Sequence, residues 1–224
     1  MLREEASWLA KNIYCLDEKE VFPLLNIGSS SREFREKEQP WIDAWLFKTA
    51  REKGYPVIHT DLKKAIGVDI VGDLNDADFR EKLGGLNIKS VLCSNLLEHL
   101  IDRETICKNI SSIVPVNGYL FLTVPYRFPY HRDPIDTMFR PDVEELRQLF
   151  PELEIVHGEI VAGGKLIQVT NIPAILYLTV MIVRLLLPVY QPLRWFDSLR
   201  YSLWLFRDIS ATCIVFQKKD PRVT

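Results

Sequence analysis

The chain has 224 residues with a formal net charge of −2, and 47% of its residues are hydrophobic. This composition excludes a chain that is disordered over most of its length, and the charge excludes the strongly positive field of a nucleic-acid-binding domain. We therefore expect no nucleic-acid partner. The four cysteines lack CxxC spacing, so we expect neither a disulfide framework nor a bound metal. No secretory signal is visible, which favours a reducing, cytoplasmic compartment.

Short apolar runs alternate with amphipathic segments along the first part of the chain. An apolar run that ends at Gly28 is typical of a buried strand entering a loop. Ser30 and Glu33 have capping-box spacing, which predicts that a helix begins there, and Gly54 is the stop signal of the next helix. In chain order we predict a helix over 4–13, a strand over 21–27, a helix from Ser30, a helix over 41–52, and strands over 57–62 and 68–71.

The same alternation continues to the carboxyl terminus. Asn117 and Gly118 predict a turn before a strong β run, and Pro141 stands where a first helical residue is expected. Strands that alternate with helices imply a mainly parallel sheet covered on both faces. The predicted elements are helices over 76–83, 102–114 and 141–150 and strands over 90–93, 119–124, 153–161 and 210–217.

Polar loops follow four successive predicted strands. In an open α/β sheet, ligands bind beyond the carboxyl ends of the strands. Gly28 lets a ligand approach the backbone, and the Asp61 carboxylate can accept two hydrogen bonds from a ribose diol. Gly72–Leu74 and Ser94–His99 follow the next two strands, so the four loops are expected to converge on one rim. Each loop taken alone is equally typical of an ordinary turn.

Five segments in this order carry a resemblance to a known family. They are NIGSSS (26–31), HTDL (59–62), VDIVGDL (68–74), VLCSNLLEHL (91–100) and NGYLFLTVPY (117–126). Together they resemble the class I S-adenosylmethionine-dependent methyltransferases, above all a small bacterial branch with LEH after the fourth strand. The resemblance covers roughly residues 20–165 and the last strand.

The resemblance implies a fold, a cofactor and an activity. The implied fold is a Rossmann-like, doubly wound α/β domain over residues 1–224, with a mainly parallel seven-stranded sheet whose last strand is antiparallel. Residues 171–207 are expected to form a helical insertion before that strand. The implied cofactor is S-adenosyl-L-methionine, and the implied activity is methyl transfer to a small-molecule, glycan or lipid-linked acceptor.

Individual residues match the cofactor site of that family by position. Gly28 corresponds to the first glycine of the cofactor loop, and Asp61 to the acidic residue that holds the ribose. Asp73 and Leu74 correspond to the pair beside the adenine, and residues 94–96 to the contacts of the methionine portion and the substrate. The resemblance thus implies cofactor contacts from Asn26, Gly28, Ser29, Ser30, Asp61, Leu62, Asp73, Leu74, Ser94, Asn95 and Leu96.

The chain also departs from the family's pattern. Asn26 stands where the family has an acidic residue, and Ser30 and Arg32 stand at its second and third glycines. A serine carries a Cβ, which disfavours a positive φ. Only Lys63–Gly67 separates the second and third strands, which is too short for a crossover helix. The third strand is therefore predicted to be rudimentary or to join the sheet without a covering helix.

Candidate catalytic residues lie in two of the loops. His131 belongs to an aromatic, proline-rich loop after the fifth strand, with Asp133 nearby in sequence to orient it. His99 follows the fourth strand. Histidine is the natural general base near neutral pH, so these three residues are the catalytic candidates. The alternative interpretation is that the prolines and aromatics only pack a long loop and that His99 caps backbone groups.

The segment before the last strand is apolar and basic. Leu166 to Val183 are uncharged, whereas 172–207 holds four arginines and one aspartate. Arg184 would fall within any span of the roughly 20 residues that a membrane helix needs, so we predict a helical insertion rather than a span. It is expected to cover the acceptor pocket, to contact the inner face of the membrane peripherally, or to form a homodimer through 172–207.

Two other function classes compete with a methyltransferase. A non-catalytic binding or scaffold protein on the same fold is favoured by the serines of the glycine loop, and cofactor calorimetry discriminates it. A nicotinamide-dependent dehydrogenase is disfavoured because the chain has no GxGxxG motif.

Overall fold

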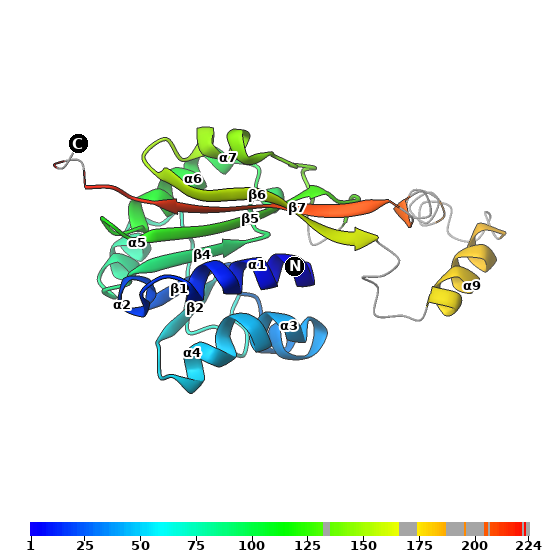
Figure 1. The fold of residues 1–224 in the computed structure, drawn as a ribbon, viewed down its shortest axis with the longest axis horizontal. Helices are drawn as coiled ribbons and strands as arrows, with labels where there is room; N and C mark the ends of the chain where they lie inside the picture. Colours follow the sequence, from blue (N-terminus) through cyan, green and yellow to red (C-terminus); the bar gives the residue numbers. More distant parts are fainter. Residues whose placement is uncertain are drawn as a thin grey trace.

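A seven-stranded sheet forms the centre of the structure, which is a computed structural model (Figure 1). The structure describes residues 1–131, 135–165, 174–186, 195, 204–205, 207–220 and 222. The strands in chain order are β1 (Leu24–Ile27), β2 (Val57–Asp61), β3 (Ile70–Val71), β4 (Ser90–Ser94), β5 (Tyr119–Arg127), β6 (Glu154–Lys165) and β7 (Asp208–Gln217).

The strands lie in the order β3-β2-β1-β4-β5-β7-β6. The first five of these are mutually parallel, and β7 is antiparallel to both β5 and β6. The predicted doubly wound, mainly parallel sheet with an antiparallel last strand is therefore confirmed. β3 has only two residues and joins β2 without a helix between them, as the short link predicts.

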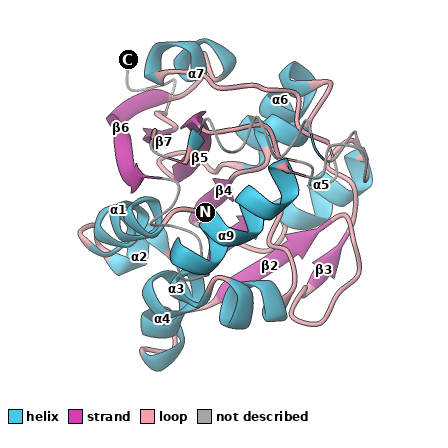
Figure 2. Ribbon diagram, turned by 90° about the vertical axis from the view of Figure 1, so that its right-hand side faces the viewer, coloured by secondary structure: helices cyan, strands magenta, loops and turns pink. Residues whose placement is uncertain are grey.

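Helices cover both faces of the sheet (Figure 2). The inner strands are buried on both sides, and β5 sends Phe121 into one hydrophobic core and Leu122 into the other, because successive side chains point to opposite faces. The first core packs under α1, α3 and α4, and the second under α5, α6 and α7. The helices are α1 (Arg3–Tyr14), α2 (Glu18–Val21), α3 (Pro40–Ile42), α4 (Lys48–Glu52), α5 (Ala77–Gly84), α6 (Arg103–Ile113), α7 (Val143–Leu149) and α9 (Ala174–Leu185).

The predicted helix start at Ser30 is wrong. Ser30 has a φ of 55°, outside the range of a capping residue. Ser31 takes that part instead, because its Oγ accepts a hydrogen bond of 3.1 Å from the Phe34 N–H. The helical segment thus begins at Arg32, with its cap one residue later than predicted, and continues into the turn over Phe34–Glu38.

Two further predicted boundaries are shifted for local reasons. The first strand begins at Leu24 rather than Val21, because Glu18–Val21 form the short helix α2. Helix α7 begins after Asp142, so Pro141 lies outside it. The Asp142 carboxylate accepts a hydrogen bond of 2.8 Å from the Glu145 N–H, and the Glu145 carboxylate accepts one in return from the Asp142 N–H. This reciprocal capping box fixes the start of the helix after Asp142, although Pro141 favours an earlier first turn.

Helix α9 lies within the predicted 171–207 insertion, apart from the sheet and on the side to which the parallel strands point (Figure 1). The rest of that segment falls largely outside the described residues. In the part of the chain that the structure describes, no helix combines the length and the apolar character needed to cross a membrane.

Candidate cofactor and acceptor site

A cavity of about 810 Å³ opens at the carboxyl ends of β1, β2, β4 and β5. Its volume lies in the range of small-molecule sites. All eleven residues expected from the family resemblance line it, and so do His99 and His131. Asp133, the third catalytic candidate, lies outside the described residues. The topology therefore brings the four predicted polar loops together at one rim.

The loop after β1 has a backbone path that leaves room for a ligand. Gly28 has a φ of 67°, and a Cβ built on it would lie 3.2 Å from Leu96 Cδ1. Ser30 also has a positive φ, of 55°, although it is not glycine. Such a conformation persists only where surrounding contacts hold it.

Arg35 is the residue that holds this loop, and no pattern in the sequence singles it out. Its side chain is buried, and its guanidinium donates hydrogen bonds of 2.7 Å to the carbonyl oxygens of Ser29, Ser30 and Gly67. A buried cation needs such partners, and here all three are backbone acceptors. No motif marks Arg35, which stands among other charged residues of a helical segment.

Asp61 links the loops after β1 and β2. Its Oδ2 accepts a hydrogen bond of 2.8 Å from the Ser30 N–H, and its Oδ1 accepts one of 3.0 Å from the Lys63 N–H. Each carboxylate oxygen has a second lone pair, so Asp61 can still accept hydrogen bonds from a ligand diol. The two backbone donors fix the direction of that carboxylate before a ligand arrives.

Asn26 occupies the position of the family's acidic residue, but it has a partner in the protein. Asn26 is buried, and its Nδ2 lies 3.0 Å from His59 Nδ1. Burial lowers the pKa of His59 to about 4, so its ring is neutral near pH 7 and Nδ1 can accept the amide N–H. Asn26 and His59 thus form an uncharged pair beneath the loop after β1, called the neutral floor below.

In the loop after β3, the backbone of Gly72 lies close to the ring of Phe79. A Cβ on Gly72 would lie 2.3 Å from the ring of Phe79, so only glycine lets this ring pack against the loop. Asp73 accepts a hydrogen bond of 2.9 Å from the Asn75 N–H, which closes a tight turn beside the cavity. Leu74 follows in the same turn, with its carbonyl bound by Arg80.

The two residues before helix α1, Met1 and Leu2, line the cavity, which the sequence pattern does not indicate. The fully buried Glu5 accepts hydrogen bonds from Asn95 Nδ2 (2.8 Å), Thr123 Oγ1 (2.6 Å) and the Leu2 N–H (2.9 Å). Glu5 therefore ties the start of α1 to the ends of β4 and β5, and Leu2 lines the cavity. Nothing in the sequence pairs an N-terminal glutamate with residues about 90 and 118 positions later.

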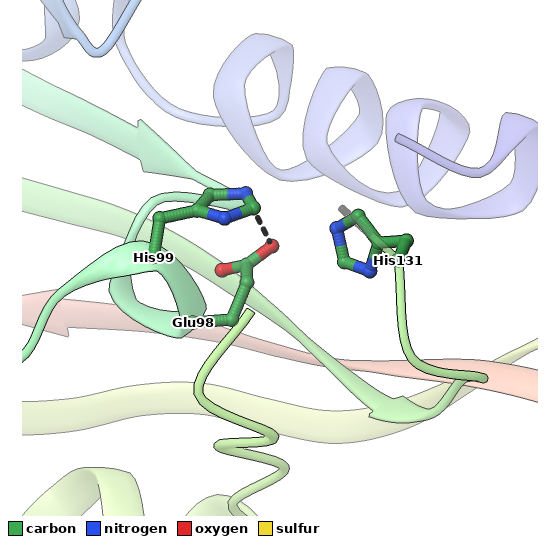
Figure 3. Close-up of side chains that lie close together, drawn as sticks. All are labelled: Glu98, His99 and His131. Carbon is green, nitrogen blue, oxygen red and sulfur yellow. Dashed lines mark ion pairs between the residues drawn. The ribbon is translucent and has the colours of Figure 1, made fainter. Parts of the chain in front are cut away.

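The two candidate histidines meet at the other end of the cavity, beside Glu98 (Figure 3). The rings of His99 and His131 lie 5.3 Å apart, edge to face. His99 Nε2 lies 3.7 Å from Oε1 of Glu98, a residue that the sequence pattern left outside the site. The carboxylate next to His131 in the described part of the chain is Asp136, whose Oδ2 lies 3.0 Å from His131 Nδ1.

Solved structures with a similar fold are known, although their sequences are dissimilar. No protein-family model and no curated protein matches the chain in sequence. Among solved structures, it resembles the MccD protein, with a TM-score of 0.55, 14% identity and coverage of 96% of each chain. It also resembles a putative sarcosine dimethylglycine methyltransferase from Galdieria sulphuraria, with a TM-score of 0.55, 11% identity and coverage of 96% of this chain and 84% of the other.

A third solved structure is similar to the same extent. It is a SAM-dependent methyltransferase from Anabaena variabilis, with a TM-score of 0.54, 11% identity and coverage of 94% of this chain and 82% of that one. At these identities the likeness shows the fold alone. The chain thus has the Rossmann-like fold of S-adenosylmethionine-dependent methyltransferases.

Proposed function

We propose that this chain binds S-adenosyl-L-methionine and transfers its methyl group to a small-molecule, glycan or lipid-linked acceptor. The observation that carries the proposal is the cavity at the strand ends, lined by the loops after β1, β2, β3 and β4. The fold adds support, because the solved structures that it resembles include SAM-dependent methyltransferases. When bound, the cofactor supplies an electrophilic methyl group on a positively charged sulfur.

The residues present fit that cofactor. Gly28 provides a place where the backbone can approach a ligand without a side chain in between. The Asp61 carboxylate, held by two backbone N–H groups, has lone pairs left for the hydroxyls of a ribose. Asp73 and Leu74 would lie beside the adenine, and Ser94 to Leu96 beside the methionine portion.

The acceptor would bind at the end of the cavity that Glu98, His99 and His131 line. Methyl transfer needs mainly positioning, and a base only where the acceptor atom carries a proton. Burial lowers the pKa of His131, so its ring is neutral near pH 7 and can accept a proton. A non-catalytic protein on the same fold is the alternative function, since Asn26 and Ser30 replace family residues.

Titration calorimetry with S-adenosylmethionine and S-adenosylhomocysteine tests this proposal. We expect the wild type to bind both and Asp61→Ala to bind at least about tenfold more weakly, because charge-assisted hydrogen bonds contribute about 1.5–3 kcal/mol each. Asp78→Ala is the matched control, since Asp78 is exposed on α5 and does not line the cavity. Absence of binding by the wild type would refute the cofactor and favour the scaffold alternative.

A further inference from the structure

Three side chains from two loops come together at the acceptor end of the cavity. Glu98 and His99 follow β4, and His131 follows β5. One ligand-type atom from each lies within 4.8 Å of the others. Figure 3 shows the Glu98 carboxylate between the two imidazoles. The set of two imidazoles and one carboxylate has the chemistry of a transition-metal site.

The carboxylate of Glu98 has no hydrogen-bond partner. Its side chain is fully buried, and neither Oε1 nor Oε2 finds a donor. The one other unpartnered buried side-chain atom in the described part of the chain is His131 Nδ1, in the same cluster. Buried polar atoms are almost always paired in folded proteins, so the two unpaired oxygens of Glu98 indicate that a ligand binds beside them.

His99 is oriented as a metal-binding histidine is. Its Nδ1 lies 2.5 Å from the Ile135 carbonyl oxygen, and because a carbonyl can only accept, Nδ1 must carry the proton. The lone pair is then on Nε2, the atom that faces Glu98. A backbone carbonyl that fixes the tautomer in this way is the usual support of a ligating imidazole.

Asp136 can give the second histidine the same kind of support. Its Oδ2 lies 3.0 Å from His131 Nδ1, although the two atoms are not aligned for a hydrogen bond. Arg140 holds the Asp136 carboxylate in place through Oδ1 at 3.1 Å and Oδ2 at 2.6 Å. With Nδ1 directed to Asp136, Nε2 is the ring nitrogen of His131 left for a metal ion, and Figure 3 shows the ring of His131 beside the Glu98 carboxylate.

We propose that Glu98, His99 and His131 bind one divalent transition-metal ion. Bonds of about 2.0–2.2 Å to nitrogen and oxygen require ligand atoms roughly 3–3.5 Å apart, so the side chains would close in by about 1 Å. Three protein ligands leave coordination positions open, and these face the cavity. If the proposed function holds, the bound ion takes over from His131 the activation of the acceptor: its open positions select an acceptor with an oxygen donor, such as a hydroxyl or a carboxylate, and hold it beside the cofactor.

Metal binding is measured on the full chain, produced without a polyhistidine tag and stripped with a chelator. Titration with Co²⁺, followed by visible absorption, and with Zn²⁺, followed by calorimetry, should give one ion per chain. Glu98→Gln and His131→Ala should each weaken binding at least about tenfold. His157→Ala, at an exposed histidine on β6, and Cys15→Ser, at the exposed cysteine, are the matched controls and should bind as the wild type does.

Two further readouts keep the test decisive. Thermal unfolding of each variant reports whether the fold is intact, and calorimetry with S-adenosylmethionine reports whether the cofactor end of the cavity is intact. If Glu98→Gln unfolds, Glu98→Asp and His99→Ala test the same site. Failure of the wild type to bind either ion, or equal binding by the ligand variants, would overturn the metal site. Neither result touches the cofactor proposal, which rests on separate binding data.

Discussion

The two ends of the cavity differ in how completely their polar groups are paired. At the cofactor end, the carbonyls of Ser29 and Ser30 and the carboxylate of Asp61 all have partners in the protein. At the acceptor end, Glu98 and His131 have unpaired buried atoms. The first end is preorganised around backbone geometry, whereas the second is complete only when something binds there. Changes at the two ends should therefore have different consequences.

The largest effect is expected from breaking the support of the cofactor end. Arg35→Ala removes three hydrogen bonds to backbone carbonyls and should lower the free energy of unfolding by about 3 kcal/mol, with loss of cofactor binding. Chemical denaturation and calorimetry measure the two effects. Arg32→Ala, in the same helical segment but exposed, is the matched control. Equal stability of the two variants would contradict the role of Arg35.

Gly28 tests whether that end depends on a bare backbone. Gly28→Ala should weaken cofactor binding at least about tenfold, because it combines a disfavoured positive φ with a Cβ that contacts Leu96. Gly54→Ala is a sharp control, since Gly54 has a φ of 73° but nothing within 4 Å of its Cβ position. Both variants should lose about the same stability, and only the first should lose affinity. Equal affinities would remove Gly28 from the site.

The neutral floor of the cofactor end predicts a pH dependence of stability. The pKa of His59 is about 4 in the folded chain, below its ordinary value of 6.5, so protonation favours the unfolded state. The resulting stability is present above pH 6.5 and is lost as the pH falls toward 4, by up to about 3 kcal/mol. His59→Gln keeps an acceptor for Asn26 and should remove this part of the loss. Parallel pH curves of unfolding free energy for the two proteins would contradict the prediction.

The smallest effect concerns α9, which belongs to neither end. Its exposed apolar side chains would bind a bilayer surface by burying apolar area, and Arg184 would be attracted to anionic lipid head groups, as expected for the insertion. These apolar side chains are Leu176, Val180, Ile182 and Val183, and Leu186 directly follows the helix. We expect weak flotation with anionic liposomes that salt reduces. Flotation that is unchanged by Val180→Ser and Val183→Ser would contradict a role for this helix, and no flotation at all would favour the lid or dimer contact.

The sequence alone determined the sheet and the cofactor rim. Alternating apolar runs and turn residues are local signals, so the strands around Asn26, Asp61 and Ser94 were found within a few residues of their ends. Since parallel strands end at one edge, placing polar loops after them was enough to predict a shared cavity. The position of Gly28 followed from the same pattern.

Only the tertiary structure decided which partners these groups have. Arg35 and Glu5 carry no motif, because their contacts join segments that lie far apart in the chain or involve backbone atoms that any residue supplies. Glu98 belongs to the LEH segment, but that pattern does not show that its carboxylate faces two imidazoles. The positive φ of Ser30 is likewise imposed by Arg35 and Asp61, against the preference of serine itself. The meeting of Glu98 with His131 depends on how two loops fold over the sheet. Local sequence pattern encodes elements, whereas long-range packing decides which side chains meet.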